Sequence, residues 1–140
     1  YLAAHPDVIS VNYAGLPSSP WHELGKKLAP KGTGAVLAFE LEGGIDAGKA
    51  FVNALTLHSH VANIGDVRSL VIHPASTTHQ QLSPEEQLAS GVTPGLVRLA
   101  VGIEGIDDII ADLDQGFAAA GAARARSAST STDPHTVASF

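Results

Sequence analysis

Arg98 lies in the middle of an apolar run, Leu96 to Val101, that has the pattern of a β-strand. A charge in such a run is costly unless it is paired, so we expect the guanidinium to hold an anion. Its planar fork of donors suits a carboxylate or a phosphate. Residue type and position leave two interpretations open, namely bidentate capture of a substrate carboxylate and a structural ion pair within the chain.

Several histidines raise the question of a metal site. His58 and His60 would share one face of an extended segment, and His73 and His79 follow. No acidic or cysteine partner occurs at a known ligand spacing, and the chain has no cysteine. We therefore interpret these histidines as strand or loop residues and expect no metal site.

Hydroxyl groups next to a histidine could form a nucleophile pair. Ser76, Thr77 and Thr78 precede His79, but no strained nucleophile elbow is present, so local bonding to the backbone is the simpler interpretation.

The glycines at 32 and 34 precede a strand instead of opening a helix, which favours a turn over a phosphate loop. Residue types alone therefore do not specify a reaction.

Composition limits the class of protein. The 140 residues, 44% of them hydrophobic, are enough for one domain with a core. A net charge of −6 without a basic cluster argues against nucleic-acid binding, and no apolar run approaches membrane-spanning length. Without cysteine or a signal-peptide pattern, we expect a cytoplasmic protein. The chain opens without methionine on what resembles a helix end before Pro6, so we expect a piece of a longer protein.

The order of elements predicts the fold that must position Arg98. Strand-like segments occupy residues 8–13, 35–41, 57–63, 70–73 and 96–101. Helices are expected after the capping residues Ser19, Gly43 and Ser83, and a last helix carries an apolar stripe from Ile106 to Phe117. Residues 120–140 lose this periodicity and are expected to be a flexible tail. We predict an α+β domain with a mostly antiparallel sheet and helices on one side.

Three segments carry a resemblance to a known family. They are residues 11–16, 70–79 and 96–104. Over residues 1–119 the chain resembles the C-terminal part of the Cys/Met-metabolism enzymes that use pyridoxal phosphate. Asn63, within residues 62–66, stands where lyases and cystathionine enzymes of the family typically have serine. This makes the chain most similar to the O-acetylhomoserine sulfhydrylases, although methionine γ-lyases share much of residues 73–76.

The resemblance implies a fold and a missing partner. Residues 1–119 would be the small C-terminal domain of the aspartate-aminotransferase-type fold, fold type I. This domain closes over a large N-terminal domain that binds pyridoxal 5'-phosphate and is absent from this chain. The residues before Pro6 would end the helix that joins the two domains. The family also suggests a homotetramer.

The resemblance further assigns roles to three residues. Arg98 matches the arginine that binds the substrate α-carboxylate, Asn63 matches a neighbouring position that helps to orient it, and Thr78 would support the arginine. None of the four lysines has the context of the Schiff-base lysine, so no catalytic or cofactor-binding residue is expected in this chain. The implied reaction replaces the acetate of O-acetyl-L-homoserine by sulfide and gives homocysteine for methionine biosynthesis. Methionine γ-lyase, a cystathionine γ-synthase or lyase, and a non-catalytic isolated domain remain alternatives.

Overall fold

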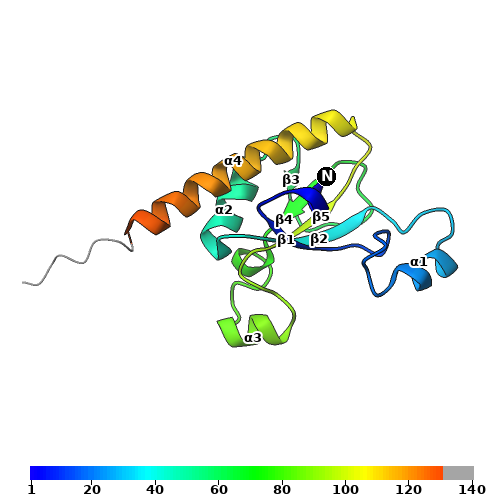
Figure 1. Cartoon of the computed structure of the whole chain (residues 1–140), viewed down its shortest axis with the longest axis horizontal. Helices are drawn as coiled ribbons and strands as arrows, with labels where there is room; N and C mark the ends of the chain where they lie inside the picture. Colours follow the sequence, from blue (N-terminus) through cyan, green and yellow to red (C-terminus); the bar gives the residue numbers. More distant parts are fainter. Residues whose placement is uncertain (131–140) are drawn as a thin grey trace, which may run out of the picture.

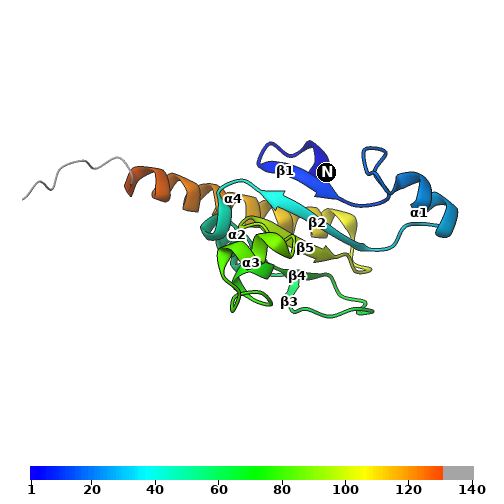
Figure 2. The same ribbon diagram turned by 90° about the horizontal axis from the view of Figure 1, so that it is seen from below.

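The computed structural model describes residues 1–130, and its centre is one five-stranded sheet (Figures 1 and 2). The strands are β1 (Val8–Asn12), β2 (Val36–Leu41), β3 (Ser59–His60), β4 (Leu70–Ile72) and β5 (Leu96–Ala100). Their spatial order is β1-β2-β5-β4-β3, which places the strand that carries Arg98 in the middle of the sheet.

The strand pairing is mostly antiparallel, as the sequence predicted. The pairs β1–β2, β2–β5 and β4–β5 are antiparallel, and the short β3 pairs with β4 in parallel. The expected extended segment at 57–63 forms only the two residues of β3, because residues 61–67 belong to a surface loop. The sheet is therefore mixed, with one weakly paired edge strand beside β4.

Two long helices, α2 (Gly44–Ala54) and α4 (Ile106–Thr130), lie side by side and pack against the sheet (Figure 1). Phe39 of β2 meets Phe51 of α2 edge-on with ring centroids 5.5 Å apart, and Phe51 meets Phe117 of α4 at 5.0 Å. Val97 and Leu99 are buried in the same core. Because side chains alternate along a strand, Arg98 points to the opposite face of the sheet.

Two short helices extend from this body (Figure 1). In α1 (His22–Leu28), which follows Ser19 and begins after Trp21, no residue is buried, and Trp21, Leu24 and Leu28 are exposed. In α3 (Pro84–Ala89), the expected capping box is confirmed. The hydroxyl of Ser83 accepts from the Glu86 N–H at 3.3 Å, and the Glu86 carboxylate accepts from the Ser83 N–H at 2.8 Å. Two 3-10 turns, η1 (Leu2–Ala4) and η2 (Pro74–Ser76), complete the elements.

The C-terminal part of α4 corrects a prediction. The helix continues to Thr130, so the expectation of an irregular tail is wrong for residues 120–130, while residues 131–140 lie outside the described part. Ala120 and Ala123 are buried, and Arg124 donates to Asp7 at 2.7 Å. Alanine is the strongest helix former and its small side chain allows close packing, so a segment without an apolar stripe can still continue a docked helix. Among residues 1–130, no helix is both long and apolar enough to cross a membrane.

Candidate functional site

Arg98 occupies the central position of the central strand. Its cross-strand neighbours are Ala38 on β2 and Ile72 on β4, one small and one apolar. The guanidinium is partly exposed on the sheet face opposite α2 and α4. Neither neighbour is charged, so neither can form an ion pair with the guanidinium and its N–H donors.

The hydrogen-bond partner of Arg98 is the loop that joins β3 to β4. Its Nη2 donates to the backbone carbonyl of Asn63 at 3.0 Å. Within residues 1–130 no carboxylate lies within ion-pair distance of this guanidinium. Arg98 therefore forms no structural ion pair in this part of the chain. Most N–H donors of its guanidinium remain available to an anion.

The structure brings together two of the three predicted site residues. Asn63 lies beside Arg98, but the contact uses its backbone carbonyl, since its side-chain oxygen accepts from the N–H of Ile64 at 2.9 Å. Thr78 is exposed, and its hydroxyl bonds to Nδ1 of His79 at 2.8 Å. No hydrogen bond joins Thr78 to Arg98 in the described chain, so its supporting role stays a prediction.

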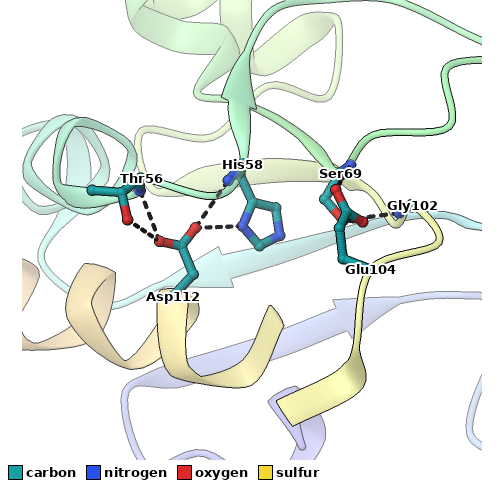
Figure 3. A network of polar contacts seen from close by, with 6 residues as sticks. All are labelled: Thr56, His58, Ser69, Gly102, Glu104 and Asp112. Atoms are coloured by element: carbon teal, nitrogen blue, oxygen red, sulfur yellow. Dashed lines mark hydrogen bonds and ion pairs between the residues drawn. The ribbon is translucent and has the colours of Figure 1, made fainter. Parts of the chain in front are cut away.

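A buried carboxylate on α4 anchors the chain just before this loop (Figure 3). Oδ1 of Asp112 accepts from the N–H and hydroxyl of Thr56 at 2.7 and 3.1 Å. Oδ2 accepts from the N–H of His58 at 3.0 Å and bonds to its ring Nδ1 at 2.7 Å. Burial raises the pKa of Asp112, but the bonds from His58 and Thr56 outweigh it and hold the pKa below its ordinary value. Asp112 is therefore ionised at neutral pH.

A second carboxylate anchors the chain just after the loop (Figure 3). The Glu104 oxygens accept from the N–H and hydroxyl of the fully buried Ser69 at 2.7 and 2.8 Å. The Ser69 oxygen in turn accepts from the N–H of Gly102 at 2.9 Å. The Ser69 N–H lowers the pKa of Glu104, so this carboxylate is also ionised at neutral pH.

Sequence reasoning missed both of these carboxylates. One signal pointed to Asp112, which lies between Ile109 and Leu113 at helical spacing and therefore falls on the buried face of its helix. An acid on an apolar face is costly unless it is hydrogen-bonded, so a partner could have been inferred. Its partners Thr56 and His58 could not, because more than fifty residues separate them from Asp112.

The histidines are used within the fold. His58 bonds to Asp112, and its Nε2 has no hydrogen-bond partner among the described residues. His73 is buried, with Nε2 bonded to the carbonyl of Pro94 at 2.7 Å and Nδ1 to the hydroxyl of Ser76 at 2.8 Å. Within residues 1–130, no three His, Asp or Glu side chains gather where they could hold a metal ion.

The lysines of this chain decide whether an aldehyde cofactor could bind to it covalently. Such a cofactor needs a lysine amine within a pocket to form its Schiff base. All four lysines are exposed, and Lys26 is paired with Glu23 at 3.3 Å. The structure provides one cationic side chain, Arg98, on the central strand. Beside it lies the loop that carries Asn63, and both ends of this loop are held by carboxylates.

Comparison with known proteins shows the family. Residues 1–118 match the family described as "Cys/Met metabolism PLP-dependent enzyme". Over 119 residues the chain is 58% identical to an O-acetyl-L-homoserine sulfhydrylase of Corynebacterium glutamicum, a match that covers 85% of the chain and 27% of that protein. It is also 49% identical over 117 residues to an L-methionine gamma-lyase of Fusobacterium nucleatum, covering 84% of the chain and 29% of the relative.

A solved structure shows the same fold. A cystathionine gamma synthase from Xanthomonas oryzae superimposes with a TM-score of 0.75 and 41% identity, covering 87% of this chain and 31% of that one. The chain thus spans less than a third of the length of the proteins it matches. The family match includes β5 with Arg98, the loop with Asn63 and both anchoring carboxylates. The chain belongs to the Cys/Met metabolism family of PLP-dependent enzymes.

Proposed function

We propose that this chain is the C-terminal, substrate-closing part of an O-acetyl-L-homoserine sulfhydrylase with a fold-type-I architecture. In the proposed reaction the bond from the γ carbon to the acetyl ester oxygen breaks and acetate leaves. A sulfide sulfur then bonds to that carbon, and the product is homocysteine. The observation that carries the proposal is Arg98, a strand-borne guanidinium without a carboxylate partner in residues 1–130.

The proposed task of Arg98 is to hold the substrate α-carboxylate. Two parallel N–H donors of a guanidinium match the two oxygens of a carboxylate, which fixes the orientation of the substrate as well as its position. The apolar neighbours Ala38 and Ile72 keep competing charges away. Asn63 supports this role by accepting one N–H through its carbonyl, so the fork cannot rotate freely.

The remaining machinery belongs to the N-terminal domain in this proposal. Pyridoxal phosphate, which the family uses, supplies the electron sink that makes carbon–heteroatom bonds of amino acids reactive. Because none of the four lysines has the context of the Schiff-base lysine, the chain alone would be inactive in this proposal. We further propose that the full-length enzyme is a cytoplasmic homotetramer.

Asn63 and the degree of identity support a sulfhydrylase over other members of the family. Asn63 stands where lyases and cystathionine enzymes typically have serine. The relatives named as O-acetyl-L-homoserine sulfhydrylases reach 58% and 52% identity, against 49% for a methionine gamma-lyase. The narrow gap keeps the methionine γ-lyase as the second candidate.

The carboxylate role is tested in the full-length enzyme with Arg98→Ala and Arg98→Lys. We expect the KM for O-acetyl-L-homoserine to rise at least about tenfold in both variants, because lysine keeps the charge but lacks the fork. Arg126→Ala is the matched control, since Arg126 is an exposed arginine on α4. An unchanged KM in Arg98→Ala would exclude the carboxylate role.

The choice of reaction is tested by product analysis of the same enzyme. A sulfhydrylase forms homocysteine and acetate from O-acetyl-L-homoserine and sulfide. A methionine γ-lyase instead converts methionine and water into methanethiol, 2-oxobutanoate and ammonia. A higher kcat/KM for the first reaction supports the proposal, and a higher value for the second makes the chain part of a γ-lyase.

A further inference from the structure

The Arg98 guanidinium is hydrogen-bonded to a loop that is largely exposed, so burial does not fix the position of this loop. Residues 61–67 carry the Asn63 carbonyl, yet Val61, Ile64 and Val67 are 42%, 81% and 63% exposed. β3, which leads into the loop, has two residues and two pairing positions. Exposed segments with few pairing bonds move easily, so something else must fix where the carbonyl lies.

Two carboxylates, the buried Asp112 and the half-buried Glu104, hold the chain on either side of this loop (Figure 3). Asp112 accepts four hydrogen bonds from Thr56 and His58, immediately before β3. Glu104 accepts two from Ser69, immediately before β4. Bonds to an ionised acceptor are roughly twice as strong as neutral ones, and water competes little with those of Asp112 because this carboxylate is buried.

Both carboxylates belong to the segment that follows Arg98 in the chain. β5 ends at Ala100, Glu104 lies in the short connection, and Asp112 lies in the second turn of α4. The connection is also bonded directly to the loop, because the N–H of Ile103 donates to the Val67 carbonyl at 3.0 Å. One continuous segment therefore carries the arginine and holds both ends of the loop that orients it.

This segment is closely packed at Gly102 and at Asp112. A Cβ added at Gly102 would lie 2.4 Å from both the Glu104 carboxylate and the Ser69 nitrogen. Asp112 is 2% exposed and Ser69 is fully buried. Asp112 and Ser69 thus have little room to move, although the loop between the two anchored points is exposed.

We propose that Glu104 and Asp112 are positioning residues for substrate binding, acting through the loop of residues 61–67 on the guanidinium of Arg98. This inference rests on the proposed function, in which Arg98 holds the α-carboxylate. Glu104 and Asp112 do not touch substrate. They set the place of the Asn63 carbonyl, and through it the direction of the fork.

The test compares two inhibitors of the full-length enzyme that differ only in the carboxylate. L-Norvaline has the amino acid head group without a leaving group, and butylamine is the same molecule without the carboxylate. In Glu104→Gln and Asp112→Asn, we expect the Ki of L-norvaline to rise about tenfold and that of butylamine to change by less than about twofold. Asp107→Asn, which removes an exposed carboxylate from the first turn of α4, is the matched control and should change neither.

A general loss of structure would give a different result. If both inhibitors weaken equally in Glu104→Gln, or neither weakens, the positioning role is wrong. If Asp112→Asn does not fold, Thr56→Val removes one bond to Asp112 and leaves the carboxylate in place. The Ki values of L-norvaline and butylamine are then compared in Thr56→Val, and the same two outcomes support or exclude the positioning role.

Arg98→Ala separates this inference from the proposed function. If Arg98→Ala leaves L-norvaline binding unchanged, the carboxylate role itself fails. If Arg98→Ala weakens L-norvaline but Glu104→Gln does not, only the positioning role fails. If both single substitutions weaken L-norvaline binding, adding Glu104→Gln to Arg98→Ala should weaken it little further. The effects of two residues that act through one contact are not additive.

Discussion

Gly48 on α2 lies so close to the ring of His73 that a Cβ at position 48 would be 2.4 Å from Nε2 of that histidine. The ring is fully buried and bonded at both nitrogens, to Ser76 and to the carbonyl of Pro94. It therefore joins the turn after β4 to the loop before β5, close to the strands that form the Arg98 site. The missing side chain of Gly48 makes room for this contact.

Gly48→Ala should destabilise the segment, because the ring cannot move without breaking its hydrogen bonds. Overpacking a tight core costs about 1–3 kcal/mol. The measurement is hydrogen exchange of the β4 and α2 amides in the full-length enzyme, which should become faster. Gly121→Ala is the control, since its Cβ meets nothing within 4 Å and alanine favours a helix. Equal exchange in both variants would contradict the close contact.

The stability of this region should fall at mildly acidic pH. Burial lowers the pKa of His73 from its ordinary value of 6.5, against the opposing effect of the Pro94 carbonyl. A lowered pKa means that the unfolded chain binds the proton more readily. The stabilisation is thus complete above the unfolded pKa and is lost as the pH falls below it. The protection factors of the β4 amides, which are corrected for the intrinsic pH dependence of exchange, should fall below about pH 6.5, and His73→Gln should reduce that dependence.

Gly43→Ala should weaken the docking of α4 more than Gly91→Ala does. Both glycines have positive φ, +97° and +81°, so alanine is strained at either position. Only at Gly43 would the new Cβ also meet a neighbour, the Arg124 side chain at 2.4 Å, whereas at Gly91 it meets nothing within 4 Å. The difference between the variants in proteolysis of residues 119–130 measures the contact. If that segment is cleaved equally fast in both, Arg124 does not pack there.

Ser83→Ala should loosen α3 without affecting the sheet. The capping box satisfies backbone donors at the start of this short helix, and loss of such a cap costs about 1 kcal/mol. Hydrogen exchange of residues 85–89 should increase while that of β5 stays constant. Ser18→Ala, a substitution in the loop before α1, serves as the control. A simultaneous change in β5 would mean that α3 supports the central strand.

The sequence alone determined the elements that depend on local pattern. Short runs rich in apolar and β-branched residues predicted β1, β2, β4 and β5, and the capping box predicted α3, because these signals act over a few residues. The charge of Arg98 in an apolar run indicated the site by residue type alone. The end of α4 was predicted wrongly, since its alanines carry no apolar stripe and the packing of Ala120 and Ala123 is a tertiary fact.

Only the tertiary structure decided how the site is held. Asn63 was predicted to help orient the substrate carboxylate, and the structure adds that it meets Arg98 through its backbone carbonyl, which no residue type reveals. The bonds from Asp112 to Thr56 and His58, and from Glu104 to Ser69, join positions far apart in the chain. These contacts form because the fold brings β5 and α4 next to residues that are far away in the sequence. A local sequence pattern spans only a few residues and cannot predict such contacts.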